Sequence, residues 1–170
     1  MNKQFFNLTS IPKQLQNRVW LERFTINISV TKNIRQELLL QTEFTTNKIN
    51  FVALSLEGLA LIQASWNSQT QEFKVEKLVN TPITSELDIK KIVHDLQAAH
   101  WPINKLKEAL HSQYSVVDSC IKGVNIRQFF YKNKVILTIH EKAEQVHFKY
   151  IDESYEIKLS RIKNSPLNMP

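Results

Sequence analysis

Apolar and polar residues alternate along the first half of the chain with the period of two that is typical of half-buried strands. The alternation is clearest in the run Phe-Thr-Ile-Asn-Ile-Ser-Val at 24–30. Glu57-Gly58 lies between two such runs and is typical of a hairpin tip. The pattern predicts strands at 24–30, 37–46, 51–56, 59–66 and 73–77.

The two strands that flank this tip carry apolar residues at both odd and even positions, as in Ala53 beside Leu54. This pattern indicates burial on both faces, as when a sheet curls around something.

The spacing of apolar residues changes after Pro82 from the period of a strand to that of a helix. Ser85 has the properties of a helix N-cap, with Asp88 at the capping-box position three residues later. Apolar residues then recur at helical spacing as far as His100. Trp101-Pro102 ends this helix, and Pro102 is suited to begin a second one. We therefore predict two helices within about 85–111.

Strand patterns return after the helices and are joined by short turns, one at Asn133 and another at 152–154. Consecutive short connections are typical of an antiparallel meander. The predicted strands are 116–121, 125–131, 134–140, 145–151 and 155–162.

The order of strands, helices and strands predicts an α+β fold that is mainly β. We expect a curved, unclosed antiparallel β-barrel of about nine or ten strands, with a central helical insertion acting as a lid. The chain is expected to be a single domain over 1–170, with flexible termini. Its strands are expected at about 19–79 and 115–162, on either side of helices at about 85–111.

Composition removes several classes of chemistry. The chain has only 2 glycines, Gly58 and Gly123, which lie too far apart for a phosphate loop, a dinucleotide fingerprint or a nucleophile elbow. The net charge is +6, and the basic residues are spread singly, as on a solvated surface. Contact with anionic lipid is the next interpretation, and nucleic acid is not expected. Cys120 lies in an apolar alternation and is expected to be a small core residue.

The histidines do not form a recognisable metal site. His140-Glu141 begins like a zincin signature, but Glu144 stands where the second histidine ligand is required. His94 and His100 are six residues apart on the predicted helix, so we interpret them as surface or lid residues. We expect no metal, no other cofactor and no catalytic residues. The rival hypothesis is an acyl-modifying enzyme that uses His140 or Asp95.

Two stretches resemble signature segments of an uncharacterised family of bacterial envelope proteins. They are Leu-Ala-Leu-Ile-Gln-Ala-Ser-Trp at 59–66 and Asp-Leu-Gln-Ala-Ala-His-Trp-Pro at 95–102, and the resemblance extends over about 20–163. Members are often predicted lipoproteins and are associated with aryl polyene gene clusters. That family is similar in architecture to the outer-membrane lipoprotein carriers and receptors, the Lol proteins, in which an unclosed barrel and its helices enclose an apolar cavity for acyl chains.

The resemblance implies a non-enzymatic envelope protein that binds an acyl, lipid or polyene-like ligand and helps to place lipids or lipoproteins at the outer membrane. Its implied partners are a lipid or acyl chain, a carrier protein of the lipoprotein-transport type, and a membrane surface. The alternatives are an enzyme or accessory factor of acyl or polyene biosynthesis, or a structural partner in an envelope complex.

The implied location is the periplasmic side of the outer membrane, if an export signal precedes this chain, and otherwise the cytoplasm. Lipoproteins of this kind carry a signal that ends in an acylated cysteine, which is not found near Met1. We therefore expect the chain to begin just after that cysteine.

Apolar residues from both halves of the chain are candidates for the cavity lining, and each fits a filled core equally well. They are Ile26, Ile28, Leu38, Leu40, Leu54, Leu61, Trp66, Leu96, Trp101 and Phe129. At the hairpin tip, Leu56 and Leu59 are candidates for contact with a membrane or client protein, and an ordinary buried turn is the alternative.

Overall fold

A computed structural model describes residues 4–28, 34–81, 84, 87–151 and 155–167. Within these residues, ten strands form one antiparallel sheet in the order β5-β4-β3-β2-β1-β10-β9-β8-β7-β6. The strands are β1 (Arg18–Ile28), β2 (Ile34–Phe44), β3 (Lys48–Leu54), β4 (Ala60–Asn67), β5 (Phe73–Lys77), β6 (Tyr114–Ile121), β7 (Val124–Tyr131), β8 (Lys134–Lys142), β9 (Gln145–Tyr150) and β10 (Tyr155–Pro166). The helical insertion consists of α2 (Ile89–His100) and α3 (Ile103–Ala109).

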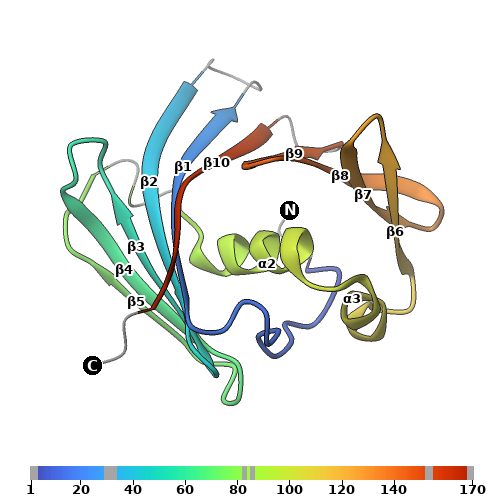
Figure 1. Cartoon of the computed structure of the whole chain (residues 1–170), viewed down its shortest axis with the longest axis horizontal. Helices are drawn as coiled ribbons and strands as arrows, with labels where there is room; N and C mark the ends of the chain where they lie inside the picture. The colour runs from blue at the N-terminus through green and yellow to red at the C-terminus, as the bar shows by residue number, and fades with distance from the viewer. Residues whose placement is uncertain (1–3, 29–33, 82–83, 85–86, 152–154, 168–170) are drawn as a thin grey trace.

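The sheet curls around α2 and stays open between β5 and β6, the two strands at its edges (Figure 1). The predicted fold, an unclosed antiparallel half-barrel with a central helical insertion, is therefore confirmed. The first and last strands pair along their whole length, from Arg18↔Pro166 to Ile28↔Tyr155. This pairing joins the strands before the insertion and the strands after it into one continuous sheet.

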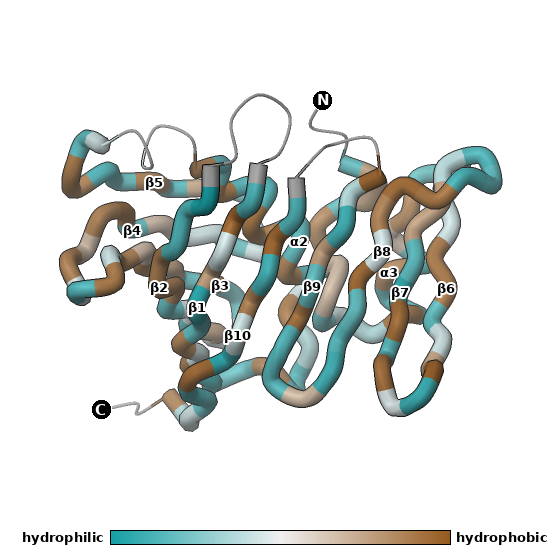
Figure 2. The backbone as a smooth tube through the Cα atoms, turned by 90° about the horizontal axis from the view of Figure 1, so that it is seen from above, coloured by the Kyte–Doolittle hydropathy of each residue, from teal (hydrophilic) through white to brown (hydrophobic). Residues whose placement is uncertain are grey.

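Alternation along the strands determines which side chains enter the concavity. Hydrophobic and hydrophilic positions alternate along β1, β10 and β9, as expected for strands with one buried face (Figure 2). On β1 and β2, Phe24 pairs with Leu38, and both are buried. Side chains fill much of the interior, and the fully buried residues include Trp66, Trp101, Phe129 and Leu106.

Helix α2 begins at Ile89, later than the sequence pattern predicts. Asp88 is itself the N-cap, and its carboxylate accepts a hydrogen bond from the Lys91 backbone N–H at 3.2 Å. The predicted capping-box role of Asp88 is therefore wrong, and the predicted N-cap, Ser85, lies outside the described residues. The extended backbone of Trp101 ends α2, and Pro102 is the N-cap of α3. The predicted break between the helices is confirmed.

The segment before β1, residues 4–17, lies along the insertion, and we call it the N-terminal strap. Phe6 forms an isolated antiparallel bridge with Leu110, just after α3. The Asn7 N–H also donates to the carbonyl of Ala109 at 3.0 Å. The strap thus ties α3 to the start of the chain.

Turns lie at both glycines, and the hairpin tip predicted at Glu57-Gly58 is confirmed. Gly58 has φ +89° and Gly123 has φ +77°, values that L-residues with a side chain rarely adopt. At the first turn, Leu56 is 47% exposed and Leu59 is 58% exposed, so the hairpin tip is an exposed apolar turn. The turn predicted at 152–154 lies outside the described residues.

The prediction that Cys120 is a core residue is wrong, because Cys120 is exposed near the end of the edge strand β6, where few side chains are covered. His94 lies on α2, within the insertion predicted as a lid, but it is a buried residue and not a surface one, because its ring packs against Phe5 and Phe6 of the strap. In the part of the chain that the structure describes, no helix is long and apolar enough to cross a membrane.

Candidate functional site

A cleft of about 470 Å³ opens beside the end of α2 and is bounded by strands β6, β7 and β8. Its volume lies in the range of small-molecule sites. Polar and apolar groups contribute about equally to its walls, so the cleft suits a molecule that carries both kinds of surface. The lining residues are Ala99, Asp118, Ser119, Cys120, Asn125, Ile126, Arg127, Ile139 and Glu141.

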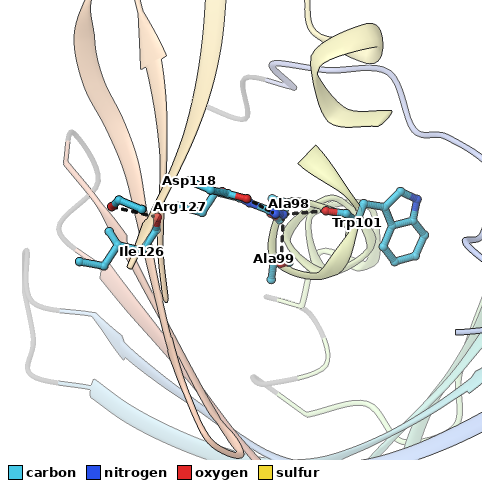
Figure 3. A network of polar contacts seen from close by, with 7 residues as sticks. Ala98, Ala99, Trp101, Asp118, Ile126 and Arg127 are labelled. Carbon is cyan, nitrogen blue, oxygen red and sulfur yellow. Dashed lines mark hydrogen bonds and ion pairs between the residues drawn. The ribbon is translucent and has the colours of Figure 1, made fainter. Parts of the chain in front are cut away.

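Arg127 joins the strand wall of this cleft to the helix (Figure 3). Its Nη1 atom donates to the carbonyl oxygens of Ala98, Ala99 and Trp101 at 2.9, 3.1 and 2.8 Å. Its Nε and Nη2 atoms donate to the two oxygens of Asp118 at 2.7 and 2.8 Å. Because the last carbonyls of a helix have no partner within it, Arg127 caps α2 while Asp118 balances its charge.

A second group of polar residues lies against the last turn of α2. Glu22 on β1 faces Arg161 on β10 in register, and Arg161 Nη2 donates to Glu22 Oε1 at 3.2 Å. The Arg161 guanidinium lies 3.8 Å from the centroid of the Trp20 ring. His100 meets the same indole edge-on, with ring centroids 4.9 Å apart. A largely buried ion pair, an indole and an imidazole therefore form one cluster.

Burial sets the ionisation of this cluster. Desolvation raises the pKa of Glu22, although the neighbouring Arg161 acts to lower it. Desolvation, together with the positive charges of Arg161 and Arg127, lowers the pKa of His100 to about 3. His100 is therefore neutral at physiological pH and can donate or accept a hydrogen bond.

The middle of α2 is attached to the opposite wall through Asp95. The hydroxyl of Tyr150 on β9 donates to Asp95 Oδ1, and the ammonium of Lys91 lies 3.5 Å from Asp95 Oδ2. The Lys91 ammonium also lies 3.8 Å from the centroid of the Tyr150 ring. These contacts hold the buried face of α2 against β9.

The strap holds the other side of α2 through polar side chains. The Thr9 backbone N–H donates to Gln97 Oε1 at 2.9 Å, and Gln97 Nε2 donates to the Thr9 carbonyl at 3.3 Å. The Trp101 indole N–H donates to the carbonyl of Ser10 at 3.0 Å. The insertion is thus held between the sheet and the strap, so exposing the concave face requires movement of one of these layers.

The structure brings most of the predicted lining residues into one core cluster. Ile26 is partly buried and packs against it, Leu54 is half-buried beside a register shift in β3, and the Ile28 side chain lies outside the described part. The buried members are Leu38, Leu40, Leu61, Trp66, Leu96, Trp101 and Phe129.

The two residues of the rival enzyme hypothesis are kept apart. Asp95 lies on α2, inside the concavity. His140 pairs with His147 and alternates with Ile139, which is buried on the concave side, so His140 belongs to the convex face. The sheet separates the two side chains, and they cannot act on one substrate atom.

Sequence reasoning missed Glu22, Arg127 and Arg161. A signal for the first was present, because Glu22 has the same parity as the apolar residues Trp20 and Phe24 and therefore had to point inward. Its partner Arg161 could not be identified, because their contact depends on pairing between strands that are 139 residues apart.

The fold and its cleft define a class of protein, an antiparallel half-barrel whose concave face is covered by a helical insertion. The chain belongs to the family described as protein of unknown function DUF3261, which matches residues 25–163. A sequence search of curated proteins finds no match.

Two solved structures match most of this chain at low sequence identity. One is a domain assigned to outer membrane lipoprotein sorting from Vibrio parahaemolyticus, with 5% identity, a TM-score of 0.41, and coverage of 91% of this chain and 86% of that chain. The other is a DUF1329 family protein from Desulfovibrio piger, with 8% identity, a TM-score of 0.36, and coverage of 91% and 87%. The association with aryl polyene gene clusters stays a prediction.

Proposed function

We propose that this protein is a non-enzymatic envelope protein that binds an acyl chain, or a polyene-like chain, between the concave sheet and the helical insertion. The observation that carries the proposal is the covered concave face. An amphipathic helix, α2, lies across an open, apolar half-barrel, and separate polar contacts attach it at Asp95 and at its C-terminal end.

The binding energy would come from the burial of the chain. Each methylene transferred from water contributes about 0.8 kcal/mol, so a long chain can offset the contacts that α2 loses when it moves. The lining would consist of the predicted residues that share the core, with Leu38 and Leu40 on the sheet and Leu96 on the helix as its centre.

Location and partners follow from the same proposal. A protein of this kind would work on the periplasmic side of the outer membrane and exchange its ligand with a membrane surface or a carrier protein. The exposed tip residues Leu56 and Leu59 support such a contact, because they present apolar side chains at the end of a hairpin. The net charge of +6 would favour an anionic surface.

Native mass spectrometry tests the binding step. The purified chain is incubated with palmitate or with the polyene fatty acid cis-parinaric acid, and the mass of the folded protein is measured. We expect one ligand per chain, together with quenching of tryptophan fluorescence in the parinarate sample, since Trp20, Trp66 and Trp101 are all buried. A protein that keeps its ligand-free mass with both chains would contradict the proposal.

Two aspartate variants test the lining. Leu96→Asp places a charge at the centre of the proposed lining, and its matched control, Val117→Asp, places a charge at an exposed position of β6. Both proteins are first shown to be folded by circular dichroism. Only the charge at Leu96 is expected to abolish uptake.

A further inference from the structure

Neighbouring strands place polar residues opposite one another on the concave face. Trp20 on β1 pairs with Thr42 on β2, and Glu22 on β1 pairs with Arg161 on β10. His100 reaches the same place from the end of α2, through its contact with the Trp20 ring. We call these five residues the polar cluster. Trp20, Glu22 and Thr42 are each at least 97% buried.

Every member of the polar cluster has a buried polar atom without a hydrogen-bond partner among the described residues. These atoms are Trp20 Nε1, Glu22 Oε2, Thr42 Oγ1, His100 Nε2 and Arg161 Nε. A buried polar group without a partner is costly, and native proteins contain few of them. Five on contacting or paired residues therefore point to a bound molecule that supplies their partners.

The chemistry of the five atoms specifies that molecule. The Trp20 and Arg161 nitrogens donate hydrogen bonds and Glu22 Oε2 accepts. The Thr42 hydroxyl does both, and the Nε2 atom of neutral His100 can do either. A complementary group must therefore both donate and accept. Because Glu22 and Arg161 already balance each other's charge, a charged group would enter this buried place with no counter-ion. An uncharged hydroxyl, glycerol or amide meets both conditions.

The polar cluster is also placed where a headgroup would lie. His100 follows Ala99, which lines the cleft, so the polar cluster and the cleft both border the last turn of α2. From the cluster, the concave face continues through Leu40 and Phe24, both buried and apolar. A ligand with its head at Glu22 and Thr42 would extend its chain along these residues.

We propose that the polar cluster binds the uncharged, hydrogen-bonding headgroup of an amphiphile such as a monoacylglycerol or a fatty alcohol. This inference rests on the proposed function, because the chain of the amphiphile would occupy the concave face. It adds that the protein selects ligands by their headgroup, which the binding of a chain alone does not require.

The test compares ligands of one chain length. Monopalmitoylglycerol, hexadecanol and palmitate are each titrated against a protein saturated with cis-parinaric acid at pH 7.5, and displacement is followed by fluorescence. We expect the two uncharged ligands to bind at least tenfold more tightly than palmitate. Such selection follows when buried polar groups are paired by one ligand and left unpaired by another.

Thr42→Val tests the cluster directly. It removes one hydroxyl at nearly constant volume, and the fold should tolerate it because that hydroxyl has no hydrogen bond to lose. We expect about a fivefold loss of affinity for monopalmitoylglycerol, the size of one hydrogen bond, and no change for palmitate. Trp20→Phe, which removes the indole N–H, should act in the same direction. Thr138→Val, at a buried threonine on the other face of the sheet, is the control.

The outcomes separate the two proposals. If none of the ligands displaces parinarate and parinarate itself does not bind, the proposed function fails. If chains bind but the headgroups do not differ, or if Thr42→Val and Trp20→Phe leave the preference unchanged, the headgroup site is overturned. In that case the polar cluster holds only structural water.

Discussion

The Nη1 atom of Arg127 lies 2.8 Å from the carbonyl oxygen of Trp101, so strand β7 caps the helix that covers the concave face. The same guanidinium is held by both oxygens of Asp118 on β6. Arg127 thereby connects the edge of the sheet with the end of α2. It sets the position of the insertion at the point where the cleft opens.

Replacement of Arg127 by methionine is expected to destabilise the protein. The change leaves the end carbonyls of α2 without a donor and Asp118 without its partner, so we expect a loss of about 2–3 kcal/mol in the free energy of unfolding. Urea denaturation followed by circular dichroism measures it. Arg127→Lys keeps the positive charge but loses the planar guanidinium, which donates to several acceptors at once. It should therefore lose less stability than the methionine variant. Wild-type stability in the methionine variant would contradict the capping role.

Loss of the Phe6 ring is expected to loosen the insertion. The ring is fully buried and stacks on His94, with centroids 4.1 Å apart. For Phe6→Ala we expect a loss of about 3–5 kcal/mol in stability and faster hydrogen exchange across α2. Mass spectrometry of deuterium uptake by peptides from 89–100 measures the second effect.

Phe51→Ala is the matched control for this prediction. Phe51 is 2% exposed and lies on β3, so its removal should reduce global stability by a similar amount. When each variant is measured at the same distance in temperature below its own unfolding midpoint, the amides of α2 should exchange faster only in the Phe6 variant. Equal exchange in both proteins would show that the strap does not hold the helix.

Acidification is expected to destabilise the protein through His100. Its folded-state pKa of about 3 lies below the ordinary value of 6.5, so the unfolded chain takes up the proton first as the pH falls. The stability present above pH 6.5 is therefore lost progressively below it, by up to about 2 kcal/mol at pH 5. Buried His94, whose pKa burial also lowers, acts in the same direction.

His100→Phe isolates this titration, because it keeps a ring against Trp20 and removes the ionisable group. The melting temperature of the variant should fall less than that of the wild type between pH 7 and pH 5. Glu22 contributes with the opposite sign in both proteins, because its raised pKa favours the folded state when protonated. If the melting temperatures of the variant and the wild type fell by the same amount between pH 7 and pH 5, His100 would be excluded as the source of the acid destabilisation.

The hairpin tip is expected to matter for membrane contact and not for stability. Because Leu56 and Leu59 are exposed, changing both to serine should alter the free energy of unfolding by less than about 0.5 kcal/mol. Sedimentation with phosphatidylglycerol vesicles should show weaker binding than for the wild type. The control pair, Val117→Ser with Ile121→Ser, removes equally exposed apolar groups from β6 and should bind as the wild type does. Equal binding by all three proteins would count against the tip as a membrane contact.

The strand–helix–strand order could be predicted from the sequence because the signals are local. A period of two, a change to helical spacing after Pro82 and Glu57-Gly58 at a tip depend only on neighbouring residues. The start of α2 was predicted less well, since Ser85 and Asp88 are both suitable caps and the choice between them depends on the packing of the chain. The burial of His94 was not predicted, because the strap that covers it comes from the start of the chain, far from α2 in the sequence.

The sequence by itself thus determined the elements, their order and the apolar parity that gives each strand a buried face. Only the tertiary structure decided which polar residues meet. Glu22 reaches Arg161 because the first and last strands pair, and Arg127 reaches Trp101 because the sheet curls back toward the insertion. Such contacts depend on the register between distant strands and on the curvature of the whole sheet, which no local pattern encodes.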